Sequence, residues 1–466
     1  MSTMPFSTSI DNKKQIQIKQ NYPIHFLHPK VTNFFIFLQA GIRIINAKKK
    51  EKKLSGSEKE IIQKIHHIRY ADENSYVTTG GHFSQLYVRN LGIFLNALLD
   101  PRIPSSEEDW VKRQSIALRT IALDLEVFRK SKKAYTTIVH VGKHFYSAMN
   151  MYTEPSDSLF GIVYTLCALQ DKSFIPSLFP APDNKQQLLQ TKAAAQKLIQ
   201  QHTETLRALI KDYKSRAIDS KTGLIKKDIY LASARDGIKR QSSFYDNVIC
   251  WSTFYLAEKL HLIALSEKEL LSWKEHIIAT FWDEEEGIFL DDVSQESKRE
   301  KRFSADAFIV TSSSFFDIKN KNDMKKLQQM TAYVQKNELD KPFPLAYSKD
   351  NHLSKLYWPV RFGAPAYMGK SIWSHWGMEY IKALILIGKS VEAKKYLLLY
   401  KENIEHYGGY PELYDPHGKI YTTLFYRGVL HNSWVINYEQ AKMMLTPPNL
   451  PLSREEKELL PPDKGD

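Results

Sequence analysis

Cysteine is almost absent from this chain of 466 residues, which contains only Cys167 and Cys250. Each lies in an apolar run typical of a helix, so the pair indicates buried free thiols and excludes a disulfide framework. Cys and His at the spacing of a zinc site are also missing, and the acidic segment 281–287 is typical of a helix end and turn rather than a calcium loop. We therefore expect no metal and no cofactor.

Long apolar runs are missing as well. The most apolar early stretch, Val31 to Ile45, is interrupted by Asn33, Gln39 and Arg43 and is too short to cross a bilayer. The first residues do not combine a charged segment with an apolar one, as a secretory signal does. We therefore expect a cytoplasmic protein without a membrane span.

Negative charge is scarcer than positive, and the formal net charge is +13. Much of the excess lies in one early run, formed by Lys48, Lys49, Lys50, Lys52 and Lys53. Such a run is typical of a solvated arm, and no nucleic-acid-binding module accompanies it, so no specific nucleic acid partner is expected. We predict a basic, partly helical arm over 1–55, one main domain over 56–450 and a polar tail over 451–466.

Strand-like alternation is scarce, and helical periodicity dominates the main domain. Capping boxes mark three helix starts, namely Ser57 with Glu60, Ser105 with Glu108, and Ser266 with Glu269. The periodicity predicts about a dozen helices near 57–70, 84–99, 106–130, 156–170, 184–216, 242–260, 266–281, 304–314, 322–337, 371–388, 390–406 and 431–445. No regular sequence repeat accompanies them, so the pattern favours consecutive helical hairpins over a solenoid.

Unusual residues gather in four long loops, at 76–82, 234–246, 357–371 and 407–427. Aromatic residues make up 12% of the chain, and many lie in these polar loops rather than on apolar helix faces. Aromatics placed in this way either pack the loops or form platforms for sugar rings. Helices that supply a scaffold and loops that supply rare residues are the usual arrangement in an enzyme.

Asp246 is the first candidate for chemistry. It follows Phe244 and Tyr245 and directly precedes an apolar helix. Aromatic packing desolvates a carboxylic acid and raises its pKa, as a general acid requires near neutral pH. The same position also fits an ordinary helix cap.

Glu412 is the second candidate. It lies between Pro411 and Leu413, with Tyr410 and Tyr414 on either side, in a loop rich in Gly and Pro. Folding does not require a glutamate there, and tyrosine hydroxyls can orient a carboxylate and its water. An ordinary surface glutamate remains the alternative.

Three further segments also place polar or aromatic residues near a predicted helix start. The segment 78–92 leads into a helix, 154–159 places an aspartate near a helix start, and 367–377 holds two tryptophans three residues apart. Taken in order, the five segments resemble those of the six-hairpin glycosidases, a superfamily that includes trehalases, processing α-glucosidases, glucoamylases and glycogen-debranching-type glucosidases. The similarity runs from about residue 75 to 445. It implies an all-α fold, an (α/α)6 toroid of helical hairpins, and a carbohydrate substrate.

The resemblance also implies roles for the two carboxylates. Ser243-Phe-Tyr-Asp-Asn247 is similar to the stretch that holds the general acid of trehalases and α-glucosidases, which implies that role for Asp246. Pro411-Glu-Leu-Tyr-Asp-Pro416 is similar to the segment that holds their base, which implies that role for Glu412. An inverting glycosidase holds two such carboxyl groups roughly 6.5–9.5 Å apart, with a water between.

Other segments resemble those that line the sugar pocket of the superfamily. Tyr87-Val-Arg-Asn90 is similar to an early Arg-Asp motif, Glu154-Pro-Ser-Asp-Ser158 to a later Asp-Ser/Thr segment, and Gly369-Lys-Ser-Ile-Trp-Ser374 to an Arg-Gly-Pro-Ile-Trp element. The residues expected to contact the sugar are Tyr87, Arg89, Asn90, Asp157, Tyr245, Asp306, Lys370, Trp373, Trp376, Tyr410 and Tyr414.

Two residues depart from the superfamily pattern. Asn90 stands where an aspartate is usual, so a charge that would support an oxocarbenium-like transition state is missing. Lys370 replaces an arginine and loses its planar fork. We expect an inverting, exo-acting hydrolase of an α-glucoside, with Asp236 and Asp306 as reserve carboxylates.

Other functions remain open. Asn90 is also compatible with a sugar-binding toroid that has lost its chemistry. An epimerase would need paired histidines near the cleft, for which His82, His375 and His431 are available. A phosphorylase would need a phosphate pocket, for which Arg361 and Lys370 are the candidates.

Overall fold

The computed structural model describes residues 5–11, 15–28, 42, 51–70, 76–80, 85–103, 106–142, 144–150, 155–171, 185–231, 234–235 and 237–445. Some predicted features lie outside these residues, namely Lys48 to Lys50, His82, Ser105, Asp236 and the tail 451–466.

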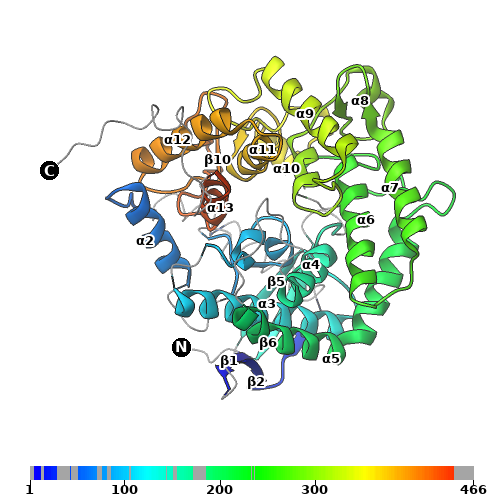
Figure 1. Ribbon diagram of the computed structural model, residues 1–466, viewed down its shortest axis with the longest axis vertical. Helices are drawn as coiled ribbons and strands as arrows, with labels where there is room; N and C mark the ends of the chain where they lie inside the picture. Colours follow the sequence, from blue (N-terminus) through cyan, green and yellow to red (C-terminus); the bar gives the residue numbers. More distant parts are fainter. Residues whose placement is uncertain are drawn as a thin grey trace.

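The outer layer of the molecule is a ring of long helices (Figure 1). In chain order these helices are α2 (Glu58–Tyr70), α3 (Glu107–Ser131), α5 (Lys185–Ala217), α7 (Glu267–Phe281), α9 (Lys321–Lys336) and α12 (Ser390–Tyr407). Helix α7 buries a stripe formed by Leu270, Ile277 and Phe281 and exposes its other faces, whereas α3 is buried on all sides from Arg113 to Phe128. Because α12 packs against α2, the outer ring closes on itself.

The inner layer alternates with the outer helices along the chain. It consists of the 3-10 segments η1 (Val88–Leu91) and η2 (Asn96–Leu99), then α4 (Ser158–Gln170), α6 (Phe244–Lys259), the 3-10 segment η4 (Ala305–Thr311), α11 (Ser374–Leu386) and α13 (Val435–Leu445). Each element packs on the next, and α13 returns to η2. The predicted all-α, (α/α)6 toroid is therefore confirmed.

The inner elements are largely buried because they are surrounded by protein. In α4, every residue from Ser158 to Leu169 is buried. The helices predicted at 84–99 and 304–314 are wrong in type, since η1, η2 and η4 are 3-10 segments. Apolar residues three apart suit both helix types, so the pattern does not distinguish them.

The predicted helix caps are largely correct. Ser266 and Glu269 form a reciprocal capping box at the start of α7, and the Glu60 carboxylate accepts a hydrogen bond of 2.8 Å from the backbone N–H of Ser57. The start of α3 lies one residue later than predicted, because Ser106 is the cap and accepts from the backbone N–H of Asp109. No helix among the described residues is long and apolar enough to cross a bilayer.

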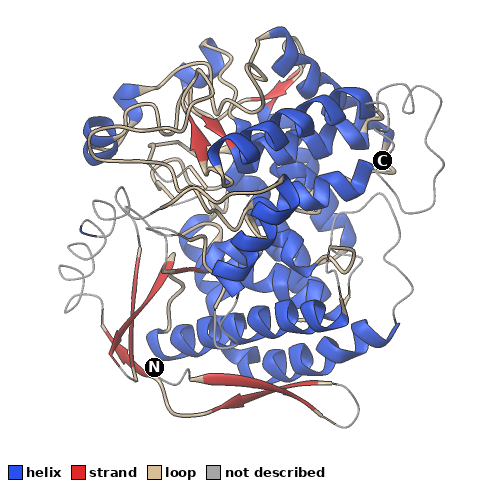
Figure 2. Ribbon diagram, turned by 90° about the vertical axis from the view of Figure 1, so that its left-hand side faces the viewer, coloured by secondary structure: helices blue, strands red, loops and turns tan. Residues whose placement is uncertain are grey.

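Several short strands were not predicted. Strands β1 (Phe6–Ile10) and β2 (Ile16–Gln20) form a hairpin, and a four-stranded sheet has the order β3 (His25–Leu27), β6 (Phe145–Met149), β5 (Thr137–Gly142) and β4 (Leu86–Tyr87). The remaining pairs are β7 (Trp282–Asp283) with β8 (Ile288–Phe289), and β9 (Ile372–Trp373) with β10 (Leu413–Tyr414). The described part of the predicted arm thus contains strands. Figure 2 shows the loops and strands mainly on one face of the ring.

Candidate active site

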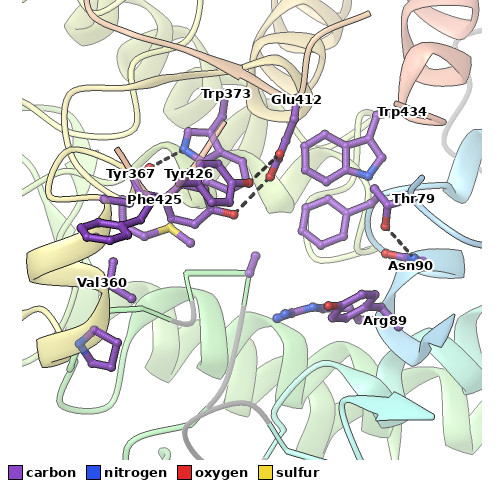
Figure 3. Close-up of a pocket in the computed structure, with 17 residues that line it drawn as sticks. Thr79, Arg89, Asn90, Val360, Tyr367, Trp373, Glu412, Phe425, Tyr426 and Trp434 are labelled. Atoms are coloured by element: carbon purple, nitrogen blue, oxygen red, sulfur yellow. Dashed lines mark hydrogen bonds between the residues drawn. The ribbon is translucent and has the colours of Figure 1, made fainter. Parts of the chain in front are cut away.

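A pocket of about 260 Å³ lies where loops from both halves of the chain meet (Figure 3). Its wall is mostly aromatic and aliphatic, with a few polar groups. The lining residues are Thr79, Tyr87, Arg89, Asn90, Phe94, Ala234, Pro359, Val360, Gly363, Ala364, Tyr367, Met368, Trp373, Glu412, Phe425, Tyr426 and Trp434. An apolar cavity with a few convergent polar groups is the usual form of a small-molecule site.

The backbone of Glu412 is fixed from two sides. The residue directly precedes β10, which pairs with β9 at the start of α11. The carbonyl oxygen of Glu412 accepts two hydrogen bonds from Ser374, one from the backbone N–H at 3.1 Å and one from the side-chain hydroxyl at 2.8 Å. The N–H of Glu412 donates to the carbonyl of Val429 at 2.8 Å. These contacts hold the side chain at the pocket wall.

The carboxylate of Glu412 is buried among hydrogen-bond donors. The hydroxyl of Tyr367 donates to Oε1 at 3.1 Å, and the hydroxyl of Tyr426 donates to Oε2 at 2.7 Å. The N–H of Val429 also donates to Oε2, at 3.2 Å. Burial raises the pKa of Glu412 to about 7, although these three donors favour the ionised form and oppose the shift.

Arg89 and Asn90 occupy the pocket wall opposite Glu412 (Figure 3). The side-chain amide of Asn90 donates to the hydroxyl of Thr79 at 3.1 Å, and the guanidinium of Arg89 lies 3.4 Å from the carboxylate of Asp157. Both residues belong to η1, which sits directly on α4. The predicted pocket residues Tyr87, Arg89, Asn90, Trp373 and Glu412 thus share one pocket.

The close packing of η1 against α4 depends on two glycines. A Cβ atom added to Gly92 would lie 2.5 Å from the Cα of Gly161. A Cβ added to Gly161 would lie 2.9 Å from the carbonyl oxygen of Val88 and 3.2 Å from the Cα of Arg89. Only glycine permits this approach of one backbone to another.

Asp246 lies in the first turn of α6 and is buried. Its backbone N–H donates to the hydroxyl of Ser243 at 3.0 Å, and that hydroxyl donates to Oδ2 at 2.6 Å. Ser243 is therefore the cap, and the carboxylate of Asp246 is not. Burial raises the pKa of Asp246, while Arg240 and the neighbouring serine hydroxyls oppose the rise.

Asp246 does not line the pocket directly. Its neighbour Tyr245 donates a hydrogen bond of 3.2 Å to Asp157, the same carboxylate that pairs with Arg89. Asp157 precedes α4 but makes no capping bond, so its side chain serves this link instead. The carboxylate of Asp157 thus links Tyr245, the neighbour of Asp246, to Arg89 in the pocket wall.

Asp306 belongs to a buried ionic network rather than to the pocket wall. Its Oδ2 lies 2.7 Å from the guanidinium of Arg240 and accepts from the hydroxyl of Tyr347 at 3.2 Å. Asp291 pairs with both Arg235, at 2.9 Å, and Arg240, at 3.1 Å. The two cations hold the pKa of Asp291 well below its usual range. This network fixes the loop that leads to Asp246.

The remaining predicted contact residues lie away from the pocket lining. The side chain of Lys370 is exposed. Trp376 is fully buried with its ring 6.3 Å from that of Tyr245, centre to centre. Tyr410 and Tyr414 are also fully buried. These three aromatic side chains pack in the protein core.

Several pocket residues were missed by the sequence argument. Tyr367 and Tyr426 hold the carboxylate of Glu412, and both lie in or beside loops that were singled out for their chemistry. Phe94 and Trp434 stack at 4.8 Å and come from opposite ends of the chain. Local sequence carries no signal for that contact.

Of the residues considered for other sugar chemistry, those that the structure describes are not in the pocket lining. His375 and His431 are both buried, and neither belongs to the pocket lining. Arg361 is exposed, like Lys370. Among the described residues, no three His, Cys, Asp or Glu side chains are grouped to hold a metal ion.

No protein-family model and no curated protein matches this chain. Solved structures do match. A rhamnosidase from Klebsiella oxytoca with rhamnose bound is 14% identical, with a TM-score of 0.49, over 83% of this chain and 63% of its own. The present chain thus covers less than two thirds of that enzyme.

Two further solved structures are similar. The GH63 mannosylglycerate hydrolase from Thermus thermophilus, in complex with Tris and D-glycerate, is 11% identical over 83% of this chain and 99% of its own, with a TM-score of 0.48. A neutral trehalase from Saccharomyces cerevisiae is 12% identical over 82% of this chain and 74% of its own, with a TM-score of 0.47.

Proposed function

We propose that the protein is a glycoside hydrolase in which Glu412 is the general base and Asp246 the general acid. One observation carries the proposal. A buried carboxylate, held by two tyrosines, faces Arg89 and Asn90 across an aromatic pocket. Burial raises the pKa of both carboxyl groups, and perturbed carboxyl groups at a pocket are typical of acid–base catalysis.

In this mechanism, Glu412 takes a proton from a water molecule, which attacks the anomeric carbon. The bond from that carbon to the leaving oxygen breaks as Asp246 protonates the oxygen. One molecule of water is consumed, and the anomeric configuration is inverted because attack and departure occur on opposite faces. Asp246 does not line the pocket, so substrate binding is expected to bring its carboxyl group and the leaving oxygen together.

The substrate is proposed to be an α-glucoside or small oligosaccharide, cleaved from its end. The pocket is small, which suits one terminal sugar better than the middle of a long chain. Trp373 and Trp434 stack with their ring centres 6.0 Å apart and line the pocket, where their apolar surface can contact a sugar ring. Arg89 and Asn90 supply donors for its hydroxyl groups.

A panel of α- and β-glycosides and disaccharides tests the proposal. Glu412→Gln and Asp246→Asn are each expected to lower kcat by a factor of about 100 or more, as expected for loss of a general acid or base. Glu402→Gln, on an exposed position of α12, is the matched control and should leave turnover unchanged. Full activity of Asp246→Asn would contradict its role.

The same panel addresses the loss of charge at position 90. Binding of oligosaccharides without any turnover, with turnover gained in Asn90→Asp, would instead identify a toroid that has lost its chemistry.

A further inference from the structure

A patch of exposed apolar side chains lies beside the mouth of the pocket. Trp358 and Phe362 on α10 (Trp358–Gly363) are 78% and 76% exposed, and Leu424 and Phe425 are 80% and 49% exposed. Large apolar side chains rarely stand in water together without a ligand or partner. We call these four residues the rim patch.

Contacts join the rim patch into one surface. Trp358 and Phe362 are four residues apart and share a face of α10. The rings of Phe362 and Phe425 lie 6.0 Å apart, centre to centre. The hydroxyl of Thr423 donates to the carbonyl of Gly363 at 2.7 Å, which fastens the loop to the helix.

The rim patch is continuous with the pocket interior. Phe425 belongs to both, since it lines the pocket and is half exposed. The segment that carries Trp358 and Phe362 also presents Pro359, Val360 and Ala364 to the pocket, and Figure 3 labels Val360 in the wall near Phe425. The polar groups of the described lining lie farther in, around Glu412 and Arg89.

We propose that the rim patch binds the leaving group of the substrate and that this group is an apolar alkyl or aryl aglycone rather than a second sugar. This inference rests on the proposed function. A sugar at the rim would bury several hydroxyl groups against side chains whose only hydrogen-bonding group is the indole N–H of Trp358, which is unfavourable. An apolar aglycone would instead remove the aromatic surface of the patch from water.

Hexyl and methyl glycosides of the sugars in the panel test the proposal, because their leaving alcohols differ in apolar area but little in acidity. The hexyl glycoside should have the higher kcat/KM by about tenfold or more, mainly through KM. Phe362→Ala should reduce that preference about tenfold and leave kcat/KM for the methyl glycoside unchanged. Phe145→Ala, at an exposed position outside the pocket lining, is the matched control.

Equal kcat/KM for the two glycosides would overturn the proposal, even if both are hydrolysed. If neither is hydrolysed, the proposed function fails, and calorimetric binding of the hexyl glycoside to wild type and Phe362→Ala still decides this inference. Weaker binding to the variant supports it, and equal binding overturns it. A change in oligomeric mass of Phe362→Ala with an unchanged hexyl preference would assign the patch to a protein interface and overturn it too.

Discussion

At the scale of single residues, the surroundings of Glu412 are unfavourable for a charged carboxylate. Burying a carboxyl group disfavours its charged form, and the donors from Tyr367, Tyr426 and Val429 offset only part of that cost. The ordinary pKa of a glutamate is 4.5, and that of Glu412 is about 7. A group held in this way exchanges protons near neutral pH, as acid–base catalysis requires.

The pH dependence of activity follows from this pKa. A general base acts when ionised, so kcat/KM should fall as pH drops through about 7, by about tenfold per unit below it. Tyr426→Phe removes a hydrogen bond that favours the ionised form, so it should move this limb to higher pH. Tyr230→Phe, at an exposed tyrosine, is the control. A profile that stays flat down to pH about 5 would contradict the assignment of Glu412.

The sequence predicts a site residue well when its immediate neighbours identify it. It predicts poorly a position that depends on contacts between segments far apart in the chain. Glu412 and Asp246 were singled out in their own segments, but their roles as base and acid came from the resemblance of the five ordered segments. The absence of Asp246 from the pocket lining depends on how α6 packs among the other inner elements, which its local sequence does not show. Trp376 and Tyr414 were assigned to the sugar because local sequence does not show whether an aromatic side chain lines a pocket or is buried in the core.

At the scale of elements, η1 shows that a local sequence pattern does not determine the type and position of an element. The apolar spacing near 84–99 predicted a helix there, but the element is a short 3-10 segment pressed against α4. Its position is determined by the Gly92–Gly161 contact, which joins segments far apart in the sequence. The strand at Leu86–Tyr87 was missed for the same reason, since its partner is β5.

The substitution Gly161→Ala tests whether the close packing of η1 on α4 positions Arg89. The added Cβ would force η1 away from α4 and displace Arg89, so kcat/KM should fall at least about tenfold while unfolding free energy falls by about 1–3 kcal/mol. Chemical denaturation and steady-state kinetics measure the two effects. Leu270→Ala, on outer helix α7, should cost similar or greater stability without loss of kcat/KM. Unchanged kinetics in Gly161→Ala would show that Arg89 needs no such support.

At the scale of the whole molecule, the pocket exists because the ring closes. The N–H of Ser433 donates to the carbonyl of Thr79 at 3.0 Å, and the side-chain amide of Asn437 donates to the carbonyl of Phe94 at 2.6 Å. These bonds join the first and last inner elements at the pocket wall. Helical periodicity predicted the helical hairpins, and the resemblance of the five segments implied the toroid. The strands were missed although β1–β2, β5–β6 and β7–β8 are local hairpins, because each strand is short; β4 and β9 in addition pair with partners distant in the sequence.

The anomeric configuration of the first product tests the central claim most directly. Proton NMR of the reaction mixture, recorded before mutarotation, reports the configuration of the released sugar. If Glu412 activates a water opposite the leaving group, an α-glycoside should release the β-anomer first. Initial release of the α-anomer would contradict the roles given to Glu412 and Asp246.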